Sequence, residues 1–408
     1  MRSTSEPVRV ARIISRLAVG GPARNVCLLT KELDPRRFRT WLICGRAEKA
    51  ERQATEVAAE AGVEPIYVDQ LRRGLGLCDL RASFRINQLL AAIKPQIVAT
   101  HTAKAGALGR GVALLRFITK HEKVGLIHTF HGHVFNHYFN TAVSKAFIAV
   151  ERQLARLTDI IITVSPTIRR QLVEEYRIAA DEKVRVVPLG LEFDWLNHLP
   201  RQRGWLRATI GANDSTIVFG SVGRLTPIKN NELLLRAFAR MLRQETVDAR
   251  LALVGDGELR EPLRALSREL GIDQRVSFCG WVLDRAKIFC DFDVTCLSSY
   301  NEGTPVCLIE SLAAGVPILA TRVGGVSDVA LNGTDGQLVE SGDEEAVAAA
   351  LIKAAHQRRR VSQQRSATVR NHYSIPRLIR NIEALYDEVL EHDKPRRAVT
   401  ARLDVQSG

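Results

Sequence analysis

The 408-residue chain lacks the features that direct a protein out of the cytoplasm or into a membrane. Its opening, MRSTSEPVRV, holds no apolar stretch of signal-peptide length, and no apolar run approaches the ~18 residues of a membrane span. The seven cysteines form no CxxC pair, which argues against a disulfide framework or a zinc site. We therefore expect a cytoplasmic protein with reduced thiols.

Signatures of nucleic-acid binding are missing as well, since the chain has no RNP, KH, zinc-finger or basic-zipper pattern. The formal charge is nevertheless +13, which predicts an anionic partner of another kind. A phosphorylated ligand and an acidic membrane face both fit. Basic residues beside such a face contribute about 1 kcal/mol each, so peripheral attachment needs no anchor.

Apolar runs of strand length alternate with helical patterns along the whole chain, which is typical of parallel sheets built from βα units. In the first half, strands are predicted at residues 8–14, 40–43, 65–68, 97–100, 125–129, 160–164 and 184–187. In the second half, they are predicted at 217–222, 251–254, 276–278, 294–297, 316–320 and 337–339. We therefore predict an α/β fold of two Rossmann-like domains.

The strand pattern breaks between residues 188 and 211, where the domain boundary is expected. The predicted parts are an N-terminal domain (1–190), a C-terminal domain (191–375), a helix packing back on the first domain (376–390) and a disordered tail (391–408). Ligands of open α/β sheets sit beyond the carboxyl ends of the strands. The loops that follow the strands should therefore hold the chemistry.

The segment NEGTPVCLIES predicts a helix start that can bind an anion. Gly303 allows close backbone approach, Thr304 is a predicted N-cap, and Pro305 suits the first helical position because it has no N–H to lose. The amides of Val306 and Cys307 are then available to a phosphate.

Charged residues accompany this helix start. Glu302 and Glu310 would repel a phosphate unless hydroxyl groups lay nearby, and a sugar nucleotide supplies both kinds of group. The loop after an earlier predicted strand begins at Gly223 and holds Arg224 and Lys229, which could clamp a diphosphate. Surface salt bridges are the alternative for these two cations.

The segment HTFHGHVFNHYF, residues 128–139, concentrates four of the ten histidines directly after a predicted strand. Zinc ligation is one alternative, although the segment offers no cysteine or carboxylate and its spacing matches no common zinc site. Histidines that cap the strand end are a second alternative. We favour the wall of a site, with His131 facing the reacting atoms and Phe135, Tyr138 and Phe139 offering apolar surface.

Two glycine turns give weaker evidence of ligand binding. Gly20 and Gly21 precede a predicted helix but complete neither a Walker loop nor a G-x-G-x-x-G, so they either hold a diphosphate or acceptor group or form a plain tight turn. The segment VSFCGWV ends a predicted strand at Gly280, where Trp281 could border a planar base.

Two further patterns are interpreted as structural. DFDV, residues 291–294, contains a D-x-D that elsewhere suggests a metal-bound nucleotide sugar, but here it precedes a strand, at the end opposite the expected site. Core packing, with membrane contact as the alternative, is predicted for one face of the helix that follows the histidine segment: Val143, Ala146, Phe147, Val150, Leu154 and Leu157.

The order of these motifs resembles the retaining glycosyltransferases of family 4, which have the GT-B architecture of two Rossmann-like domains facing across a cleft. The order is a glycine pair, HTFHG, GRL with a lysine, GDG, VSFCG, and EGTP with a second glutamate after seven intervening residues. The similarity covers about residues 8–390. HTAKAGALGR, which begins at His101, and HTFHGH are similar to members that build bacterial capsule, exopolysaccharide or O-antigen units.

The resemblance implies a role for each residue of the donor side. Arg224 and Lys229 would neutralise the donor diphosphate, Glu310 would hold the ribose hydroxyls, and Glu302 would meet hydroxyls of the transferred sugar. The loop that starts at Gly223 would form one part of the phosphate cradle. The amides of residues 303–307 would complete it.

Other implied roles concern the base and the acceptor. Gly280 and Trp281 would border the base, and Pro305 stands where many members have a residue with an N–H. The groups that would face the acceptor and the reacting carbon are Gly20, Gly21, His101 and His131.

The implied reaction is a front-face substitution that keeps the anomeric configuration and needs neither a metal nor a cofactor. The expected donor is a UDP-sugar, and the expected acceptor is lipid-linked or a glycan, at the inner face of the cell membrane. A non-hydrolysing UDP-sugar 2-epimerase and a catalytically silent nucleotide-sugar scaffold are the alternatives.

Overall fold

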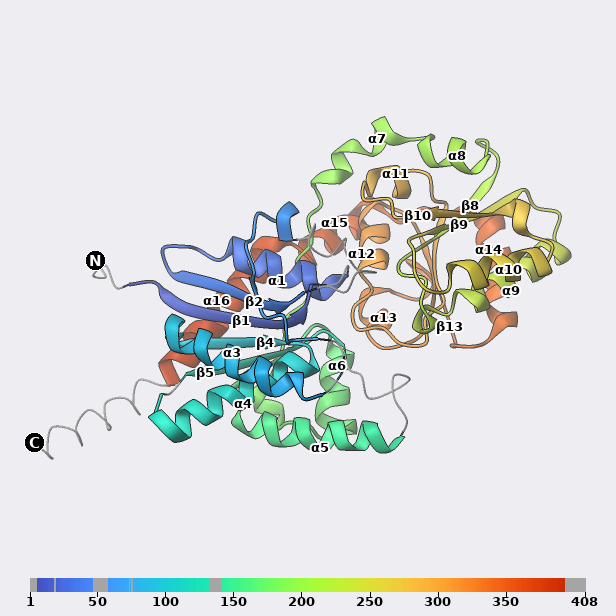
Figure 1. The fold of residues 1–408 in the computed structure, drawn as a ribbon. Helices are drawn as coiled ribbons and strands as arrows, with labels where there is room; N and C mark the ends of the chain where they lie inside the picture. Colours follow the sequence, from blue (N-terminus) through green and yellow to red (C-terminus); the bar gives the residue numbers. More distant parts are fainter. Residues whose placement is uncertain are drawn as a thin grey trace, which may run out of the picture. The chain divides into compact units, whose positions relative to one another are not determined.

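A computed structural model describes residues 6–17, 20–46, 58–72, 74, 76–122, 124–132 and 141–392 (Figure 1). The chain divides into two compact units. The first unit is Met1–Gly190 with Ile375–Gly408, and the second unit is Leu191–Ser374. Each contains one parallel sheet, which confirms the predicted class of two Rossmann-like domains.

The first sheet has seven parallel strands in the order β3-β2-β1-β4-β5-β6-β7. Their bounds are β1 (Val8–Arg16), β2 (Phe38–Gly45), β3 (Ile66–Tyr67), β4 (Ile97–His101), β5 (Gly125–Phe130), β6 (Ile160–Thr163) and β7 (Val184–Val186). All five residues of β4 are buried, as expected for a strand covered on both faces.

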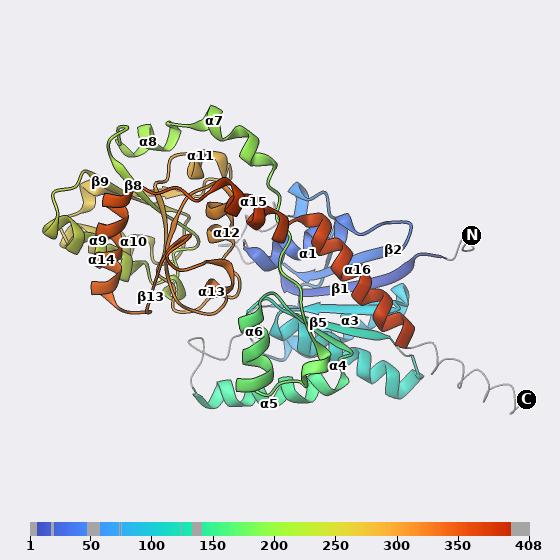
Figure 2. The same cartoon turned by 180° about the vertical axis from the view of Figure 1, so that it is seen from behind.

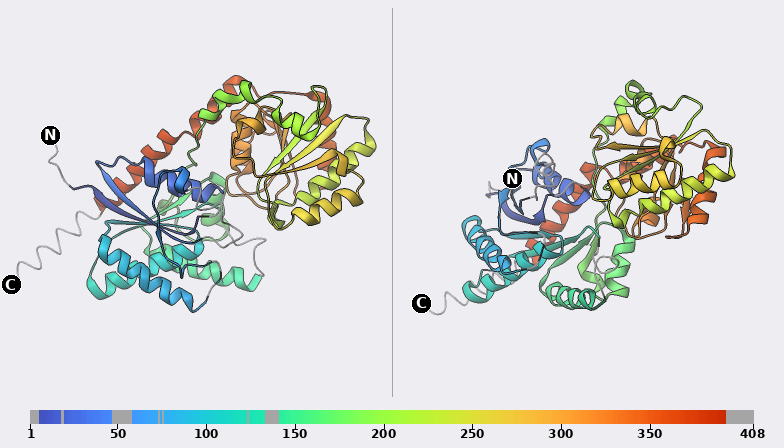
Figure 3. Two further views of the ribbon diagram at one scale, coloured as in Figure 1. Left: turned by 45° about the horizontal axis from the view of Figure 1, so that its top comes forward. Right: turned by 45° about the vertical axis from the view of Figure 1, so that its right-hand side comes forward.

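Helices cover both faces of this sheet (Figure 3). One face carries α1 (Gly21–Glu32) and α16 (Ile375–His392). The other carries α3 (Cys78–Ile93), α4 (Ala103–Lys120) and α5 (Thr141–Leu157). Successive residues of a strand face opposite sides of the sheet. In β1, Val10 accordingly packs with α16, whereas Ala11 packs with α3 and α4.

The C-terminal helix α16 lies along the first sheet beside α1 (Figure 2). Its Leu378, Ile382 and Tyr386 belong to the same buried cluster as Val10 and Phe38. It also includes Glu391 and His392, which were predicted as part of a disordered tail, and that prediction is wrong for these two residues. The rest of the predicted tail lies outside the described residues.

The second sheet has six parallel strands in the order β10-β9-β8-β11-β12-β13. Their bounds are β8 (Ile217–Val222), β9 (Ala249–Val254), β10 (Val276–Gly280), β11 (Val294–Leu297), β12 (Ile318–Thr321) and β13 (Gly336–Val339). The main helices of this unit are α9 (Asn231–Gln244), α10 (Arg260–Glu269), α12 (Val306–Ala313), α14 (Glu344–Gln357) and α15 (Gln363–His372).

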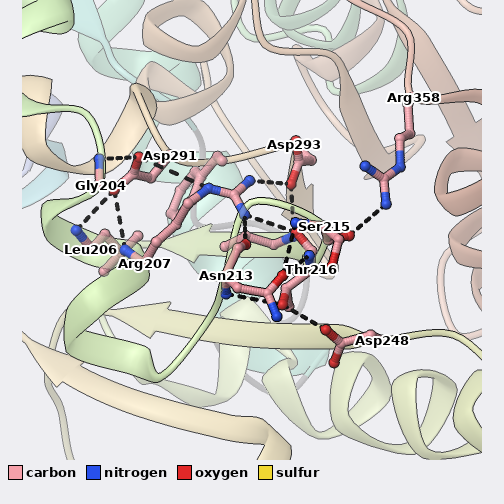
Figure 4. A network of polar contacts seen from close by, with 12 residues as sticks. Gly204, Leu206, Arg207, Asn213, Ser215, Thr216, Asp248, Asp291, Asp293 and Arg358 are labelled. Atoms are coloured by element: carbon pink, nitrogen blue, oxygen red, sulfur yellow. Dashed lines mark hydrogen bonds and ion pairs between the residues drawn. The ribbon is translucent and has the colours of Figure 1, made fainter.

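The D-x-D of the second unit supports the short helix α8 (Trp205–Ile210), as Figure 4 shows. Asp291 accepts hydrogen bonds from the backbone N–H groups of Gly204, Leu206 and Arg207 at 2.7, 2.9 and 3.1 Å. Asp293 pairs with the Arg207 guanidinium at 2.7 Å beside the starts of β8 and β11. The structural interpretation of this motif is confirmed.

The predicted apolar face of α5 is wrong in part. Ala146 is exposed, and Val150 and Leu157 are 50% and 38% exposed. The buried face instead contains Glu151, which pairs with Arg110 of α4 at 2.7 Å. A count of apolar residues cannot detect this, because the helix orientation depends on a buried ion pair with another helix.

Candidate functional site

The predicted donor residues of the second unit lie at the carboxyl edge of its sheet. Strand order reverses there between β8 and β11, which is the switch point where open α/β sheets bind ligands. β8 leads directly into Gly223 and Arg224, and β11 leads into the loop that holds Glu302. The structure therefore brings together loops that are about eighty residues apart in sequence.

Lys229 and Glu302 form an ion pair at this edge, with Nζ and Oε1 2.5 Å apart. Glu302 Oε1 also accepts a hydrogen bond from Ser299 Oγ at 2.6 Å. Ser298 Oγ donates to the Lys229 carbonyl at 3.1 Å, and the Tyr300 N–H donates to the Ile228 carbonyl at 2.9 Å. The β11 loop thus fixes the lysine loop in place.

The electrostatics of this pair favour a charged lysine. Burial is the largest single influence and would lower the Lys229 pKa, but the neighbouring groups, the Glu302 carboxylate foremost, together raise it. Arg224 is exposed and makes no ion pair with a described residue, so its guanidinium is available to an anion. The salt-bridge alternative therefore holds for Lys229 in this state and not for Arg224.

Helix α12 begins at Val306, with Pro305 as its N-cap residue. The predictions of Thr304 as N-cap and Pro305 as first helical residue are wrong, because Pro305 has ψ 96°, outside the helical region, while its carbonyl accepts from Leu308 N–H. The amides at the start of α12 still lack carbonyl partners within the helix, which suits an anion. The Cys307 thiol is buried, which raises its pKa to about 12 and keeps it protonated.

Glu310 lies in α12 and is buried. Its Oε1 lies 3.3 Å from Nε of Arg285. The Nη1 of Arg285 donates to the Glu192 carbonyl at 3.3 Å. Arg285 was not among the predicted site residues. Its one signal was its place in the loop after β10, at the edge of the sheet where ligands bind.

Two glycines allow the loops of this edge to meet. A Cβ on Gly255 would lie 1.9 Å from the Gly223 carbonyl oxygen, and a Cβ on Gly324 would lie 1.8 Å from the Glu302 carbonyl oxygen. Gly280 is joined to the same edge, since its carbonyl accepts from the Gly255 N–H at 2.7 Å. Trp281 follows it and is half-buried.

The first unit brings two of its predicted residues together at the carboxyl edge of its own sheet. His101 ends β4 and His131 follows β5, and His101 Nδ1 lies 3.0 Å from His131 Nε2. Gly20, with φ 153°, and Gly21 start α1 after the neighbouring strand β1. The strand order of this sheet reverses between β1 and β4, so these residues also flank a switch point.

The histidine segment is structurally divided. His128 is buried, with Nδ1 2.8 Å from Thr100 Oγ1, and therefore belongs to the core. Burial, reinforced by the charges of Arg110 and His131, holds the His128 pKa well below its usual range. Phe135, Tyr138 and Phe139 lie outside the described residues.

Known families match both units. The family model described as "Glycosyltransferase Family 4" matches residues 19–195, and "Glycosyl transferases group 1" matches residues 216–357. A UDP-Gal:alpha-D-GlcNAc-diphosphoundecaprenol alpha-1,3-galactosyltransferase of Escherichia coli is 27% identical over 357 residues, 86% of this chain and 89% of that protein. An N-acetyl-alpha-D-glucosaminyl L-malate synthase of Bacillus anthracis is 30% identical over 48% of this chain and 52% of its own length.

Solved structures share the fold at low identity. Anabaena HepE in complex with UDP and glucose matches with a TM-score of 0.73 and 18% identity, covering 93% of this chain and all of HepE. The sucrose-phosphate synthase of Thermosynechococcus elongatus matches with a TM-score of 0.75 and 17% identity over 94% of this chain and all of its own.

Proposed function

The chain belongs to the family 4 glycosyltransferases, and we propose that it transfers a sugar from a UDP-linked donor to a lipid-linked or glycan acceptor with retention of configuration. The observation that carries the proposal is the group of Arg224, Lys229 and Glu302 beside the start of α12, all at one switch point. Two cations and a helix start suit a diphosphate, and an adjacent carboxylate suits sugar hydroxyls.

The named relatives support the choice of donor and acceptor. The Escherichia coli relative is named for UDP-Gal and a diphosphoundecaprenol acceptor, and HepE was solved with UDP and glucose. In the proposed mechanism the leaving phosphate accepts the acceptor proton, while Arg224 and Lys229 stabilise the charge that develops on it. We propose that no metal is needed, and that the product belongs to a cell-surface polysaccharide.

The test is acceptor-dependent release of UDP. Purified protein is mixed with a panel of UDP-sugars and a diphospholipid-linked sugar, and free UDP and the anomeric configuration of the product are measured. We expect UDP only when donor and acceptor are both present, and a retained anomeric configuration. Epimerised UDP-sugar without acceptor would support the epimerase, and donor binding without turnover would support the scaffold.

We also propose that the protein attaches to an anionic membrane surface through α3, α4 and α5. In the part of the chain that the structure describes, no helix has the length and apolarity to cross a bilayer. The three helices pack side by side. On them, or immediately before α3, lie eight exposed large apolar residues: Leu77, Leu80, Phe84, Leu115, Phe117, Ile118, Val150 and Leu157.

The exposed surface of α3, α4 and α5, here called the three-helix face, has a charge that fits an anionic membrane. Its two acidic side chains are neutralised within the protein, since Asp79 pairs with Lys104 and Glu151 pairs with Arg110. The exposed charged side chains of the three helices are all cationic: Arg81, Arg85, Lys120, Lys145, Arg152 and Arg156. Apolar residues among cations are typical of helices that lie in a membrane interface.

Sedimentation with vesicles tests this face. We expect the protein to bind anionic vesicles and not neutral ones, and to be released at high salt. Leu80→Asp combined with Phe84→Asp should weaken binding about tenfold or more, because each buried large apolar side chain contributes about 1.5–3 kcal/mol. Leu331→Asp, an exposed leucine of the second unit, is the matched control. Equal binding to both vesicle types, or unchanged binding of the double variant, would refute the proposal.

A further inference from the structure

Arg12 is a buried cation without a carboxylate. It lies in the middle of β1, is 1% exposed, and forms no ion pair with a described residue. Its Nη2 donates to the Leu29 carbonyl at 3.4 Å, and its Nη1 lies 3.4 Å from His101 Nε2. An apolar side chain would suit a sheet core better. Packing alone therefore does not explain this arginine.

The contacts of Arg12 determine where two histidine protons lie. Arginine only donates and stays charged, so the His101 Nε2 that faces it must accept and carries no proton. The His101 proton is then on Nδ1, which lies 3.0 Å from His131 Nε2. His131 Nε2 must therefore accept, and its own proton is on Nδ1. Among the described residues, this buried Nδ1 has no hydrogen-bond partner.

The backbone beside His101 is strained. Thr102 has φ 68° and ψ 151°, which a β-branched residue rarely adopts. Two hydrogen bonds with Ser15 at the end of β1 hold it, one from Thr102 Oγ1 to Ser15 Oγ at 3.0 Å and one from Ser15 N–H at 3.4 Å. Strain of this kind gathers at functional sites. It occurs here at the junction between the strand of Arg12 and the strand of His101.

We propose that Arg12 is a positioning residue: through His101 it fixes the tautomer of His131, so that His131 presents an N–H donor, and not a lone pair, to a substrate oxygen. The contact between His131 and a substrate rests on the glycosyl transfer proposed above. The tautomer of His131 does not depend on that proposal. An N–H donor suits a hydroxyl or phosphate oxygen. His131 is then not the base that removes the acceptor proton, and a leaving phosphate has to take that proton.

The same groups keep both rings neutral. Burial is the main cause that holds the His101 pKa well below its usual range, and the charges of His131, Arg12 and His128 add to it. Burial lowers the His131 pKa to about 4. A proton added to His131 would face the His101 N–H, so the chain of hydrogen bonds opposes it as well.

The remaining charged and titratable neighbours act in the same direction. Arg110 of α4 faces His128 on the other side of the sheet. Cys27 of α1 lies near Arg12, and burial raises its thiol pKa to about 11, so it stays neutral across the relevant range. None of these groups favours a proton on His101 or His131.

The proton positions can be read from long-range 1H–15N spectra of protein labelled at histidine, without any substrate. In the wild type, we expect His131 to be neutral with its proton on Nδ1 down to about pH 5. In Arg12→Met, both histidines should show mixed tautomers, and the His101 pKa should rise, because a nearby cation is lost. Arg12→Lys should restore the wild-type tautomer, since lysine keeps a cationic donor.

Activity provides the second readout. We expect Arg12→Met to lower kcat/KM about tenfold at neutral pH, because part of the molecules then carry the wrong His131 tautomer. Arg9→Met is the matched control, because Arg9 lies in the same strand but bonds to the Lys94 carbonyl. The thermal unfolding of each variant shows whether it is folded.

Two results would overturn the inference: a wild-type His131 with its proton on Nε2 or with two protons at neutral pH, or an Arg12→Met spectrum with unchanged tautomers. If Arg12→Met does not fold, the wild-type and Arg12→Lys spectra still decide the question. If the spectra show the predicted tautomers but no sugar is transferred from any donor, the proposed function is refuted and the positioning role of Arg12 still holds.

Discussion

Replacing Lys229 by methionine is expected to lower kcat/KM about 10²- to 10³-fold, as removal of a charge-stabilising donor does in other active sites. Lys229 is the group that would meet the negative charge on the leaving diphosphate. The nearby Glu302 carboxylate raises the Lys229 pKa, so the ammonium stays charged at neutral pH. Methionine keeps an unbranched side chain of similar length and removes the ammonium group with its charge and its hydrogen-bond donors. Steady-state kinetics of UDP release measure the effect.

The Lys229–Glu302 ion pair leads to a second prediction, in which a substitution strengthens UDP binding while it slows sugar transfer. Before the donor binds, Glu302 holds Lys229 at 2.5 Å, so a diphosphate has to compete with the carboxylate. Glu302→Gln should therefore bind UDP about tenfold more tightly, because a like charge is removed, and yet transfer sugar more slowly. Lys287→Met serves as a control, since Lys287 lies over the Trp205 ring in the same unit. Full activity of Lys229→Met would contradict the proposed site.

The sheets could be predicted because parallel strands are buried on both faces and leave continuous apolar runs in the sequence. Each of the thirteen predicted strand segments overlaps an observed strand. The ends were less predictable: β12 starts at Ile318 and not at residue 316, since Val316 N–H bonds to the Ser311 carbonyl as part of the preceding turn. Local hydrogen bonds of this kind decide boundaries, and the apolar pattern does not record them.

The site was predictable where its chemistry follows a strand. Arg224, Lys229 and Glu302 each lie in a loop after a predicted strand, and a parallel sheet brings such loops to one edge. Arg285 and Arg12 were not predictable in this way. Arg285 meets Glu310 across the fold, and Arg12 stands inside the strand VRVARIISR, where an arginine is normally expected to face solvent. A charged residue between the apolar Ala11 and Ile13 was the one signal available for Arg12.

A second large effect is expected from Glu151→Leu, which should lower the free energy of unfolding by about 3–5 kcal/mol. Glu151 and Arg110 are both buried, and their ion pair spans 2.7 Å between α5 and α4. The substitution leaves the Arg110 guanidinium inside the protein without its carboxylate. The hydroxyl of Thr158 and the Gly106 carbonyl remain as its partners, and neither is charged. Urea denaturation followed by circular dichroism measures the loss.

The double variant Arg110→Met with Glu151→Leu separates the ion pair from the packing around it. Because both charges are then removed together, we expect it to regain most of the stability that the single variant loses. Glu122→Gln is the matched control: Glu122 pairs with another arginine of α4, Arg116, but its side chain is 43% exposed, so its loss should change stability by about 1 kcal/mol at most. Equal destabilisation by the single and double variants would mean that shape, and not charge, holds α5 against α4. Since α5 presents its apolar residues outward only in the orientation that buries Glu151, the same double variant also decides whether the three-helix face depends on this pair.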